Sequence, residues 1–187
     1  MKLFVGLGNP GSQYTHTRHN IGWRVIDHLV SDAQARTVSK KTFYGDLYRD
    51  GNLFFLKPTT YMNHSGQSVL AVKQFFKIDL EDIVVIHDDI DLPFGALRFK
   101  QGGGHGGHNG LRSIDVPLGK AYFRVRMGVG KPAHKSQVAD YVLHDFFEEE
   151  SIHLDAWIAH AAHACLALTQ QPFDTVRTHF SRKSIEA

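Results

Sequence analysis

Short apolar segments alternate along the chain with longer stretches in which apolar residues recur every three or four positions. Residues 2–5 are largely apolar and predict a first strand, and the unbroken apolar run at 83–86 is typical of a strand buried on both faces. Further strands are predicted at residues 43–48, 53–56, 97–99 and 123–129. The first two of these flank Asp50-Gly51, a dipeptide that favours a hairpin turn.

Three helices are predicted between these strands. The first begins near Asn20, a plausible capping residue, and its apolar positions are Ile21, Val25, Ile26, Leu29 and Val30. The second carries, on neighbouring positions, Val69, Val72, Phe75 and Phe76. A short third helix is predicted around residues 111–114. Helices that alternate with short strands predict an α/β layer fold.

The C-terminal part of the chain is predicted to be helical from Asp145. Asp145 and Glu148 have the spacing of a capping box. One side of the helix is predicted to carry Ile152, Trp157, Ala161, Cys165 and Leu168. His160 and His163 are interpreted as part of its polar face.

Length and composition suit one globular domain. With 187 residues, of which 42% are hydrophobic and 21% charged, the chain is predicted to form a single domain over residues 1–187. The one cysteine, Cys165, excludes an intramolecular disulfide framework and suits a reducing compartment. No segment reaches the roughly 18 apolar residues that a membrane span needs. We therefore expect a cytoplasmic protein that makes no contact with membranes.

The charge of the chain is unevenly distributed. The net charge is only +2, but eight Lys and Arg residues between positions 98 and 135 are opposed there by Asp115 alone. Such a stretch would suit a docking surface for a polyanion, and it would equally suit a solvated face with scattered charges. The pattern alone leaves both interpretations open.

The segment GLGNPG at residues 6–11 matches the G-x-G-x-x-G pattern of dinucleotide-binding loops. In those loops a helix begins at the second glycine and its amides meet the pyrophosphate. Here Pro10 and the polar run at 12–19 postpone the helix, so NAD or FAD binding is disfavoured. We interpret the glycines as a tight turn that brings Asn9 to the carboxyl edge of the sheet.

Candidate binding and catalytic side chains, most of them polar, gather in this way at four element ends. They lie in GLGNPG and the residues after it, in KPTTYMNHSG, in HDDID and in GGHGGHNG, and they include Asn9, His19, Tyr61, Met62, Asn63, Asp88, His108 and Asn109. Four such loops at one sheet edge predict a pocket. Amide side chains both donate and accept hydrogen bonds and so suit a neutral polar substrate, while a His19–Asp88 pair could deprotonate a water molecule.

A covalent mechanism has little support in the sequence. The segment NHSGQ around Ser65 lacks the first glycine of a G-x-S-x-G nucleophile motif. Cys165 is expected to be buried among apolar residues. Water is therefore the expected nucleophile.

Five segments in register closely resemble the bacterial-type peptidyl-tRNA hydrolase family, from Met1 to about Glu150: GLGNPGSQYTHTRHNIG, KPTTYMNHSG, DDIDLPFGALRFK, GGGHGGHNGLRSI and FRVRMGVG. The resemblance implies a three-layer sandwich with a mixed, twisted sheet flanked by helices. It implies hydrolysis of the ester between a peptide and the terminal ribose of tRNA, without a metal or other cofactor, by an enzyme that is commonly monomeric.

The resemblance also implies roles for residues. His19 is the counterpart of the general base, Asp88 orients it, and Asn63 or nearby amides would stabilise the oxyanion. The positions that match the peptide and 3′-end site are Asn9, Tyr14, Tyr61, Met62, Asn63, His108 and Asn109. Positions that match tRNA phosphate contacts are Arg98, Lys100 and Arg126.

Two other functions remain open at this point. A metal-dependent phosphodiesterase or nuclease could assemble a cation site from Asp88, Asp89, His105 and His108. A non-catalytic tRNA-binding module would explain the basic stretch but not the histidine, carboxylate and amides of the predicted pocket.

Overall fold

The strands pair into one seven-stranded sheet in the order β2-β3-β4-β1-β5-β7-β6, in a computed structural model that describes residues 1–185. The strands are β1 (Lys2–Gly6), β2 (Arg36–Thr37), β3 (Gly45–Asp50), β4 (Leu53–Pro58), β5 (Ile83–Asp89), β6 (Leu97–Gln101) and β7 (Phe123–Gly128). The central strand β1 runs parallel to β4 and β5, and β5 runs parallel to β7. The pairs β2–β3, β3–β4 and β6–β7 are antiparallel, so the sheet is mixed.

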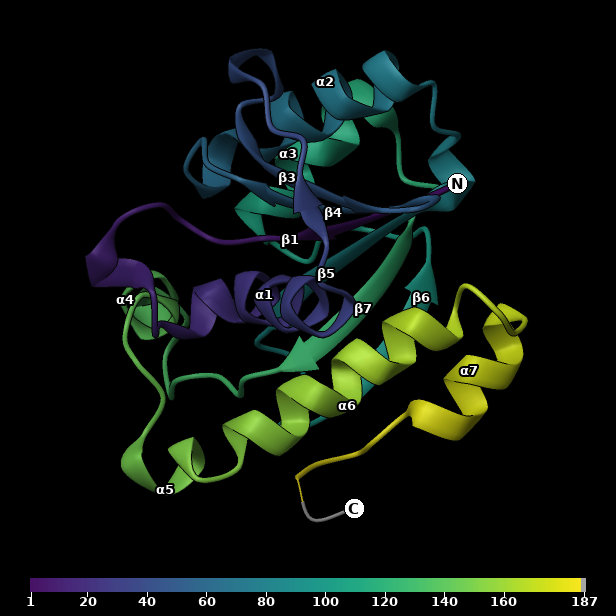
Figure 1. Cartoon of the computed structure of the whole chain (residues 1–187). Coiled ribbons are helices and arrows are strands. Elements are labelled where there is room, and N and C mark those ends of the chain that lie inside the picture. The colour runs from purple at the N-terminus through teal and green to yellow at the C-terminus, as the bar shows by residue number, and fades with distance from the viewer. Residues whose placement is uncertain (186–187) are drawn as a thin grey trace.

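Helices cover both faces of this sheet (Figure 1). They are α1 (Ile21–Ala33), α2 (Ser65–Phe76), α3 (Asn109–Leu118), α4 (Val138–Val142), α5 (Glu148–Ser151), α6 (Leu154–Ala167) and α7 (Phe173–Phe180). Helices α2 and α3 pack together on one face, and α1 and α6 lie side by side on the other (Figure 1). The predicted three-layer α/β sandwich with a mixed sheet is confirmed.

The central strands contribute side chains to two separate hydrophobic cores. Along β1, Phe4 belongs to the core under α1 and α6, while Leu3 and Val5 belong to the core under α2 and α3. Successive side chains of a strand point to opposite faces, so a strand between two helical layers is apolar at every position. This explains why residues 3–5 and 83–86 form unbroken apolar runs.

The packing of β1 against α1 brings two glycines together. A Cβ atom on Gly6 would lie 2.2 Å from the carbonyl oxygen of Gly22, and one on Gly22 would lie 2.4 Å from that of Ile86. Glycines here let the helix approach the strands at backbone distance. The first half of GLGNPG therefore serves helix packing, and the loop that follows it is held against the sheet.

The prediction for the C-terminal region is partly wrong. Asp145 forms an isolated β-bridge with Thr17, and the helix begins only at Glu148, where the backbone N–H of Phe147 donates to the Glu150 carboxylate at 2.9 Å. The expected Asp145–Glu148 capping box is absent because Asp145 pairs with a distant segment. The helical region is also divided into α5, α6 and α7. Ile152 lies between α5 and α6 and is 79% exposed, so it does not belong to the apolar side on which it was predicted.

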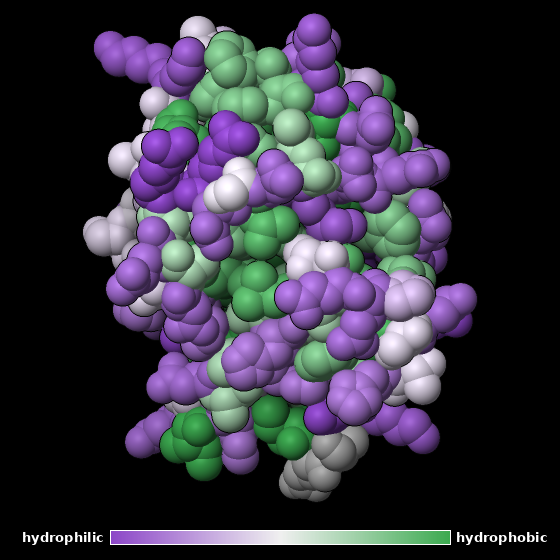
Figure 2. All heavy atoms as spheres, turned by 45° about the vertical axis from the view of Figure 1, so that its right-hand side comes forward, coloured by the Kyte–Doolittle hydropathy of each residue, from purple (hydrophilic) through white to green (hydrophobic). Residues whose placement is uncertain are grey.

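Other expected elements are confirmed with small shifts. The hairpin is formed by β3 and β4, with β3 starting at Gly45, and the short third helix extends over Asn109–Leu118. Within residues 1–185 no helix is both long and apolar enough to cross a membrane. Hydrophilic residues dominate the face in Figure 2, with smaller hydrophobic patches between them.

Candidate active site

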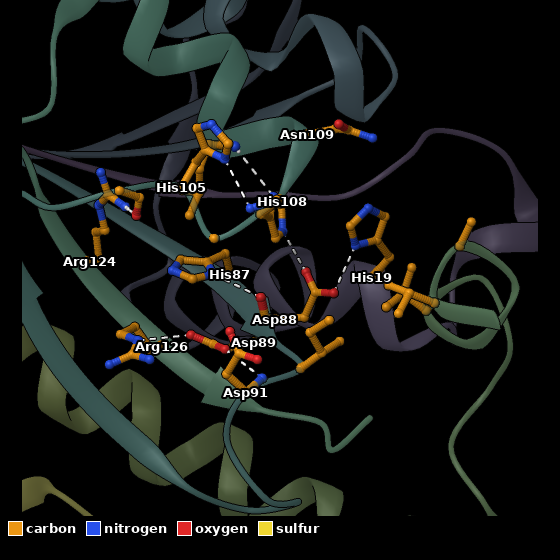
Figure 3. Close-up of a pocket in the computed structure, with 18 of the residues that line it drawn as sticks. His19, His87, Asp88, Asp89, Asp91, His105, His108, Asn109, Arg124 and Arg126 are labelled. Carbon is orange, nitrogen blue, oxygen red and sulfur yellow. Dashed lines mark hydrogen bonds and ion pairs between the residues drawn. The ribbon is translucent and has the colours of Figure 1, made fainter. Parts of the chain in front are cut away.

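A cavity of about 670 Å³ opens at the carboxyl end of β5. Its walls are the end of β5, the glycine-rich segment 104–108, two arginines of β7, and residues 135–142 of a 3-10 turn and α4 (Figure 3). Because β1 and β5 are parallel neighbours, the loops that follow them leave the sheet at the same edge. Three of the four segments predicted to meet at that edge line this cavity, with His19, Asp88 and His108, whereas no residue of KPTTYMNHSG lines it.

Two histidines hold the carboxylate of Asp88 from both sides. His19 Nδ1 lies 2.8 Å from Asp88 Oδ2, and His108 Nε2 lies 2.8 Å from Asp88 Oδ1. Figure 3 shows both rings directed at this carboxylate, and their centroids are 5.0 Å apart. The Asp88 side chain is 2% exposed, so both of its oxygens are used inside the protein.

The hydrogen bonds determine which nitrogen of each ring carries the proton. His108 Nδ1 accepts from the backbone N–H groups of Gly110 and Leu111 at the start of α3, at 3.1 and 3.3 Å. Its proton is therefore on Nε2, which donates to Asp88. His19 likewise donates from Nδ1, which leaves its Nε2 as an unprotonated nitrogen with a free lone pair, and within residues 1–185 nothing bonds to it.

This arrangement keeps Asp88 ionised although it is buried. Burial alone would raise its pKa, but the charges of His19 and His108 and their hydrogen bonds lower the pKa of the carboxyl well below its usual value. An ionised Asp88 can only accept hydrogen bonds. It therefore fixes the tautomers of both histidines.

A second network fixes the loop that carries Asn9. The side chain of Asn20 accepts from the backbone N–H of Asn9 at 2.9 Å and donates to its carbonyl at 3.0 Å. Asn20 was expected to cap α1, but its side chain makes no capping bond there because both of its polar atoms bind this loop. Asn9 Oδ1 in turn accepts from the backbone N–H of Met62 at 2.7 Å. The amide nitrogen Nδ2 of Asn9 remains as a donor.

Met62 links this network to the histidines. It is buried, and a Cβ on Gly110 would lie 2.6 Å from its sulfur and 3.0 Å from Cε1 of His108. The Asn9 loop, Met62 and the start of α3 are thus packed around the same point. The sequence predicted Asn9, Met62 and His108 for one pocket, and the structure brings them together.

The other predicted pocket residues are more exposed. Asn63 is exposed within the 3-10 turn Met62–His64, and Tyr61 is 57% exposed with a left-handed φ of 50°. Tyr14 is half-buried at the end of the 3-10 turn Ser12–Tyr14. Asn109, the first residue of α3, is exposed and lines the cavity. Of these four residues only Asn109 lines the cavity with His19 and His108, and within residues 1–185 none of the four side chains is fixed by a hydrogen bond to another side chain.

The three predicted phosphate-binding residues lie on β6 and β7. Lys100 and Arg126 line the cavity, and Arg98 stands directly opposite Arg126 in the antiparallel ladder. Arg126 Nε donates to the carboxylate of Asp89 at 2.8 Å (Figure 3). Residues opposite each other in a ladder share a face, so these three cations form one surface beside the cavity.

Sequence reasoning missed the structural role of Arg124. It was counted only as part of the basic stretch, but it is 2% exposed and donates to the carbonyl oxygens of Gly104 and Gly103 at 2.6 and 2.9 Å. It thereby holds the glycine-rich segment against β7. Its position inside a strand, between two apolar residues, is shared by the half-exposed Arg126, so the sequence carried no signal that Arg124 is buried.

Arg18 was also missed. Its guanidinium is buried, lies 3.9 Å from the ring centroid of Tyr141, and donates to the Tyr141 carbonyl at 3.0 Å. Its backbone N–H donates to the carbonyl of His144 at 3.1 Å. Arg18 precedes His19, so it ties the histidine to the α4 wall of the cavity.

The cation site expected for a nuclease does not form as predicted. Within residues 1–185, the groups of three side chains that could hold a metal are His19–Asp88–His108 and His28–Asp32–His163. Asp89 is bound to Arg126, and His105 Nδ1 accepts from the backbone N–H of Gly107. Cys165, as expected, is fully buried, and burial raises the pKa of its thiol to about 12.

Known proteins match this chain over its full length. A family model described as peptidyl-tRNA hydrolase matches residues 3–187, beyond the expected limit near Glu150. Peptidyl-tRNA hydrolase of Sulfurovum sp. (strain NBC37-1) is 65% identical over 186 residues, which cover 100% of this chain and 98% of that protein. That of Sulfurimonas denitrificans is 54% identical over 97% of each protein.

A solved structure agrees with these sequence matches. The crystal structure of peptidyl-tRNA hydrolase from Acinetobacter baumannii has a TM-score of 0.93 at 36% identity, and the match covers 99% of this chain and 96% of that chain. Sequence and fold agree over the whole length. The chain therefore belongs to the peptidyl-tRNA hydrolase family.

Proposed function

We propose that this chain, as one domain over residues 1–187, hydrolyses the ester bond between the peptide and the terminal ribose of peptidyl-tRNA. Family membership supports this reaction. The observation that carries the chemistry is the position of His19, whose Nδ1 is held by the buried Asp88 while its Nε2 is free. A base of this kind can activate water and needs no covalent intermediate on the protein.

In the proposed mechanism, His19 Nε2 removes a proton from water as its oxygen attacks the ester carbonyl carbon. The resulting tetrahedral intermediate carries a negative charge on the former carbonyl oxygen. When the ester C–O bond breaks, the proton on His19 passes to the leaving ribose oxygen. The products are a peptide with a free carboxyl group and a tRNA with a free ribose hydroxyl, and His19 is again neutral.

Asp88 acts in this mechanism as a positioning residue. It fixes the His19 ring in the tautomer that exposes Nε2, and its charge stabilises the imidazolium formed in the first step. His108 donates to the other carboxylate oxygen and keeps Asp88 from turning. His108 is itself fixed by backbone N–H groups at the start of α3. The start of this helix therefore positions His19 through His108 and Asp88.

Amide side chains would bind the reacting groups. Asn9 Nδ2 is a donor on a loop fixed by three hydrogen bonds, so it is preorganised to hold a carbonyl oxygen of the substrate. Asn63 and Asn109 are exposed beside it and would donate to the oxyanion or to the peptide. Tyr14, Tyr61 and Met62 would contact the peptide and the 3′ end.

The cationic surface of β6 and β7 would bind the tRNA backbone. Lys100 and Arg126 line the cavity next to Asp88, and Arg98 extends this surface along the ladder. Phosphate contacts are indifferent to sequence, which suits an enzyme that must accept many tRNAs. We further propose that the enzyme acts as a monomer, because all these groups come from one chain, and in the cytoplasm, because the single cysteine suits a reducing compartment.

Release of peptide from N-acetyl-aminoacyl-tRNA tests the proposal. The wild type should release peptide with and without EDTA, and His19→Ala should lower kcat by roughly 10²–10⁴-fold with tRNA binding nearly intact. His16→Ala, an exposed histidine in the same loop, is the matched control and should behave as the wild type. Normal turnover in His19→Ala would show that His19 is not the general base. Loss of activity in EDTA would favour a metal-dependent enzyme.

A further inference from the structure

A second group of potential ligands lies on α1 and α6, outside the proposed active site. His28 and Asp32 are one turn apart on α1, with His28 Nε2 3.0 Å from Asp32 Oδ2. His163 on α6 approaches from the neighbouring helix, and its ring centroid is 6.5 Å from that of His28. The two helices lie side by side (Figure 1), so three side chains from two elements converge.

The ligand atoms of this group lie close enough to share one ion. One atom from each of His28, Asp32 and His163 lies within 4.8 Å of the other two. In a tetrahedral zinc site with bonds of about 2.0–2.2 Å, ligand atoms are roughly 3.3–3.5 Å apart. Small side-chain rotations would close this difference, and they are open to Asp32 and His28, which are 56% and 30% exposed.

The hydrogen bonds around α6 leave His163 free for such a role. His160, one turn earlier, is bound through Nε2 to the carbonyl oxygen of Phe180 at 2.8 Å. Within residues 1–185, His163 has no hydrogen bond or ion pair of its own. Both histidines were predicted to lie on one polar face, but the structure separates their contacts, and His163 is the one that faces α1.

We propose that His28, Asp32 and His163 bind one divalent transition-metal ion of the zinc type. Two imidazoles and one carboxylate suit Zn²⁺, and water would complete the coordination. His28 lies seven residues after the first residue of α1, roughly 10 Å along the helix, so the ion is separate from His19. The inference does not depend on the proposed function.

The consequence of binding would be a cross-link between two helices of one core. Residues 32 and 163 are far apart in sequence, so the unfolded chain does not hold the three ligands together. An ion that binds only the folded state stabilises it. At a free Zn²⁺ concentration a hundred times its Kd, the melting temperature should rise by roughly 5–10 °C.

Zinc titration of the metal-free protein tests this site. Calorimetry and melting curves should show one Zn²⁺ per chain, with affinity at least tenfold weaker in His28→Ala and in His163→Ala. His153→Ala, an exposed histidine next to the first residue of α6, is the matched control and should bind as the wild type. The His163→Ala variant should release peptide at the wild-type rate.

Two results would overturn the proposal. One is the absence of any heat or melting shift in excess Zn²⁺. The other is binding that remains unchanged in both His28→Ala and His163→Ala. If that remaining zinc also stops peptide release, the ion occupies His19, Asp88 and His108 instead, and the surface group binds no metal.

Discussion

His19 Nδ1 and Asp88 Oδ2 lie 2.8 Å apart although 69 residues separate them in the chain. His19 ends the loop after β1, and Asp88 belongs to the end of β5, the parallel neighbour of β1. The pairing of two strands therefore brings a base to its carboxylate. His108 adds a second bond to the same carboxylate from a third segment.

Replacing Asp88 with Asn should separate orientation from charge. An amide offers one acceptor and one donor, so it cannot accept from both His19 and His108. Either His19 moves its proton to Nε2 and loses its basic nitrogen, or His108 moves its proton to Nδ1 and meets the amides of α3. We expect kcat to fall by roughly 10²–10⁴-fold with a nearly unchanged KM.

Asp91→Asn is the control for this variant. Asp91 is exposed and lines the same cavity, so its replacement removes an equal charge without touching a histidine. Initial rates of peptide release across a range of substrate concentrations give kcat and KM. An equal loss of kcat in Asp91→Asn would mean that cavity charge, and not the bonds to His19, accounts for the effect.

His87 should make the folded state sensitive to acid. It is 3% exposed, its Nδ1 lies 2.8 Å from the carbonyl oxygen of Asp88, and its buried Nε2 has no hydrogen-bond partner within residues 1–185. Burial, with the nearby charge of His108, lowers its pKa from 6.5 to about 4 in the folded state. The unfolded state therefore takes up the proton first, and the free energy of unfolding falls as the pH drops from about 6.5 to 4.

Urea unfolding between pH 7 and pH 4 measures this effect. The His87 contribution is complete above pH 6.5 and decreases by up to about 1.4 kcal/mol per pH unit below it. His87→Gln should remove that part of the slope, while His153→Gln, at an exposed position, should keep it. An identical slope in wild type and His87→Gln would show that His87 takes up its proton over the same pH range in the folded and the unfolded state.

Lys100 should contribute to tRNA binding through charge. It is exposed, lines the cavity and belongs to the same ladder face as Arg98 and Arg126. Lys100→Ala should weaken binding and lower the slope of log K against log salt by roughly 0.7–0.9, the value for one phosphate contact. Lys73→Ala on α2 is the control, and an equal slope change there would assign the effect to net charge.

Much of this fold could be predicted because its strands carry local signals. Residues 3–5 and 83–86 are apolar at every position since both faces of the sheet are covered, and glycines mark the loops at its edge. The pairing of His19 with Asp88 was predicted by placing the loop before the first helix and the end of the strand at 83–86 at one edge of the sheet. Local pattern and global fold agree at these positions.

The contacts that could not be predicted join distant segments. Asp145 has the local spacing of a helix cap, but its pairing with Thr17 takes precedence. Asn20 has the composition of a cap, yet it binds the Asn9 loop. Arg124 is a charged residue whose partners are backbone carbonyls 20 and 21 residues away, and no sequence pattern indicates such partners.

Arg18 should determine how firmly α4 closes the cavity. Its guanidinium is stacked on Tyr141, lies 4.7 Å from the ring centroid of Phe147 and 3.5 Å from Glu150, and donates to a carbonyl of α4. Lysine keeps the charge, but its ammonium group cannot stack as the planar guanidinium does and does not hold its donors in a rigid fork. Arg18→Lys should reduce the free energy of unfolding by roughly 1–3 kcal/mol and raise KM.

Urea unfolding and amide hydrogen exchange of residues 138–145 measure this prediction. Exchange there should accelerate in Arg18→Lys more than in α2, because the α4 segment loses its bond to the His19 turn while the core under α2 is unchanged. Arg24→Lys, on α1, is the matched control, since within residues 1–185 that arginine has no ion pair or hydrogen bond to lose. If Arg18→Lys is as stable as the wild type and α4 exchanges at the same rate, apolar packing of Val142 and Phe146 must hold this wall, and the arginine is dispensable there.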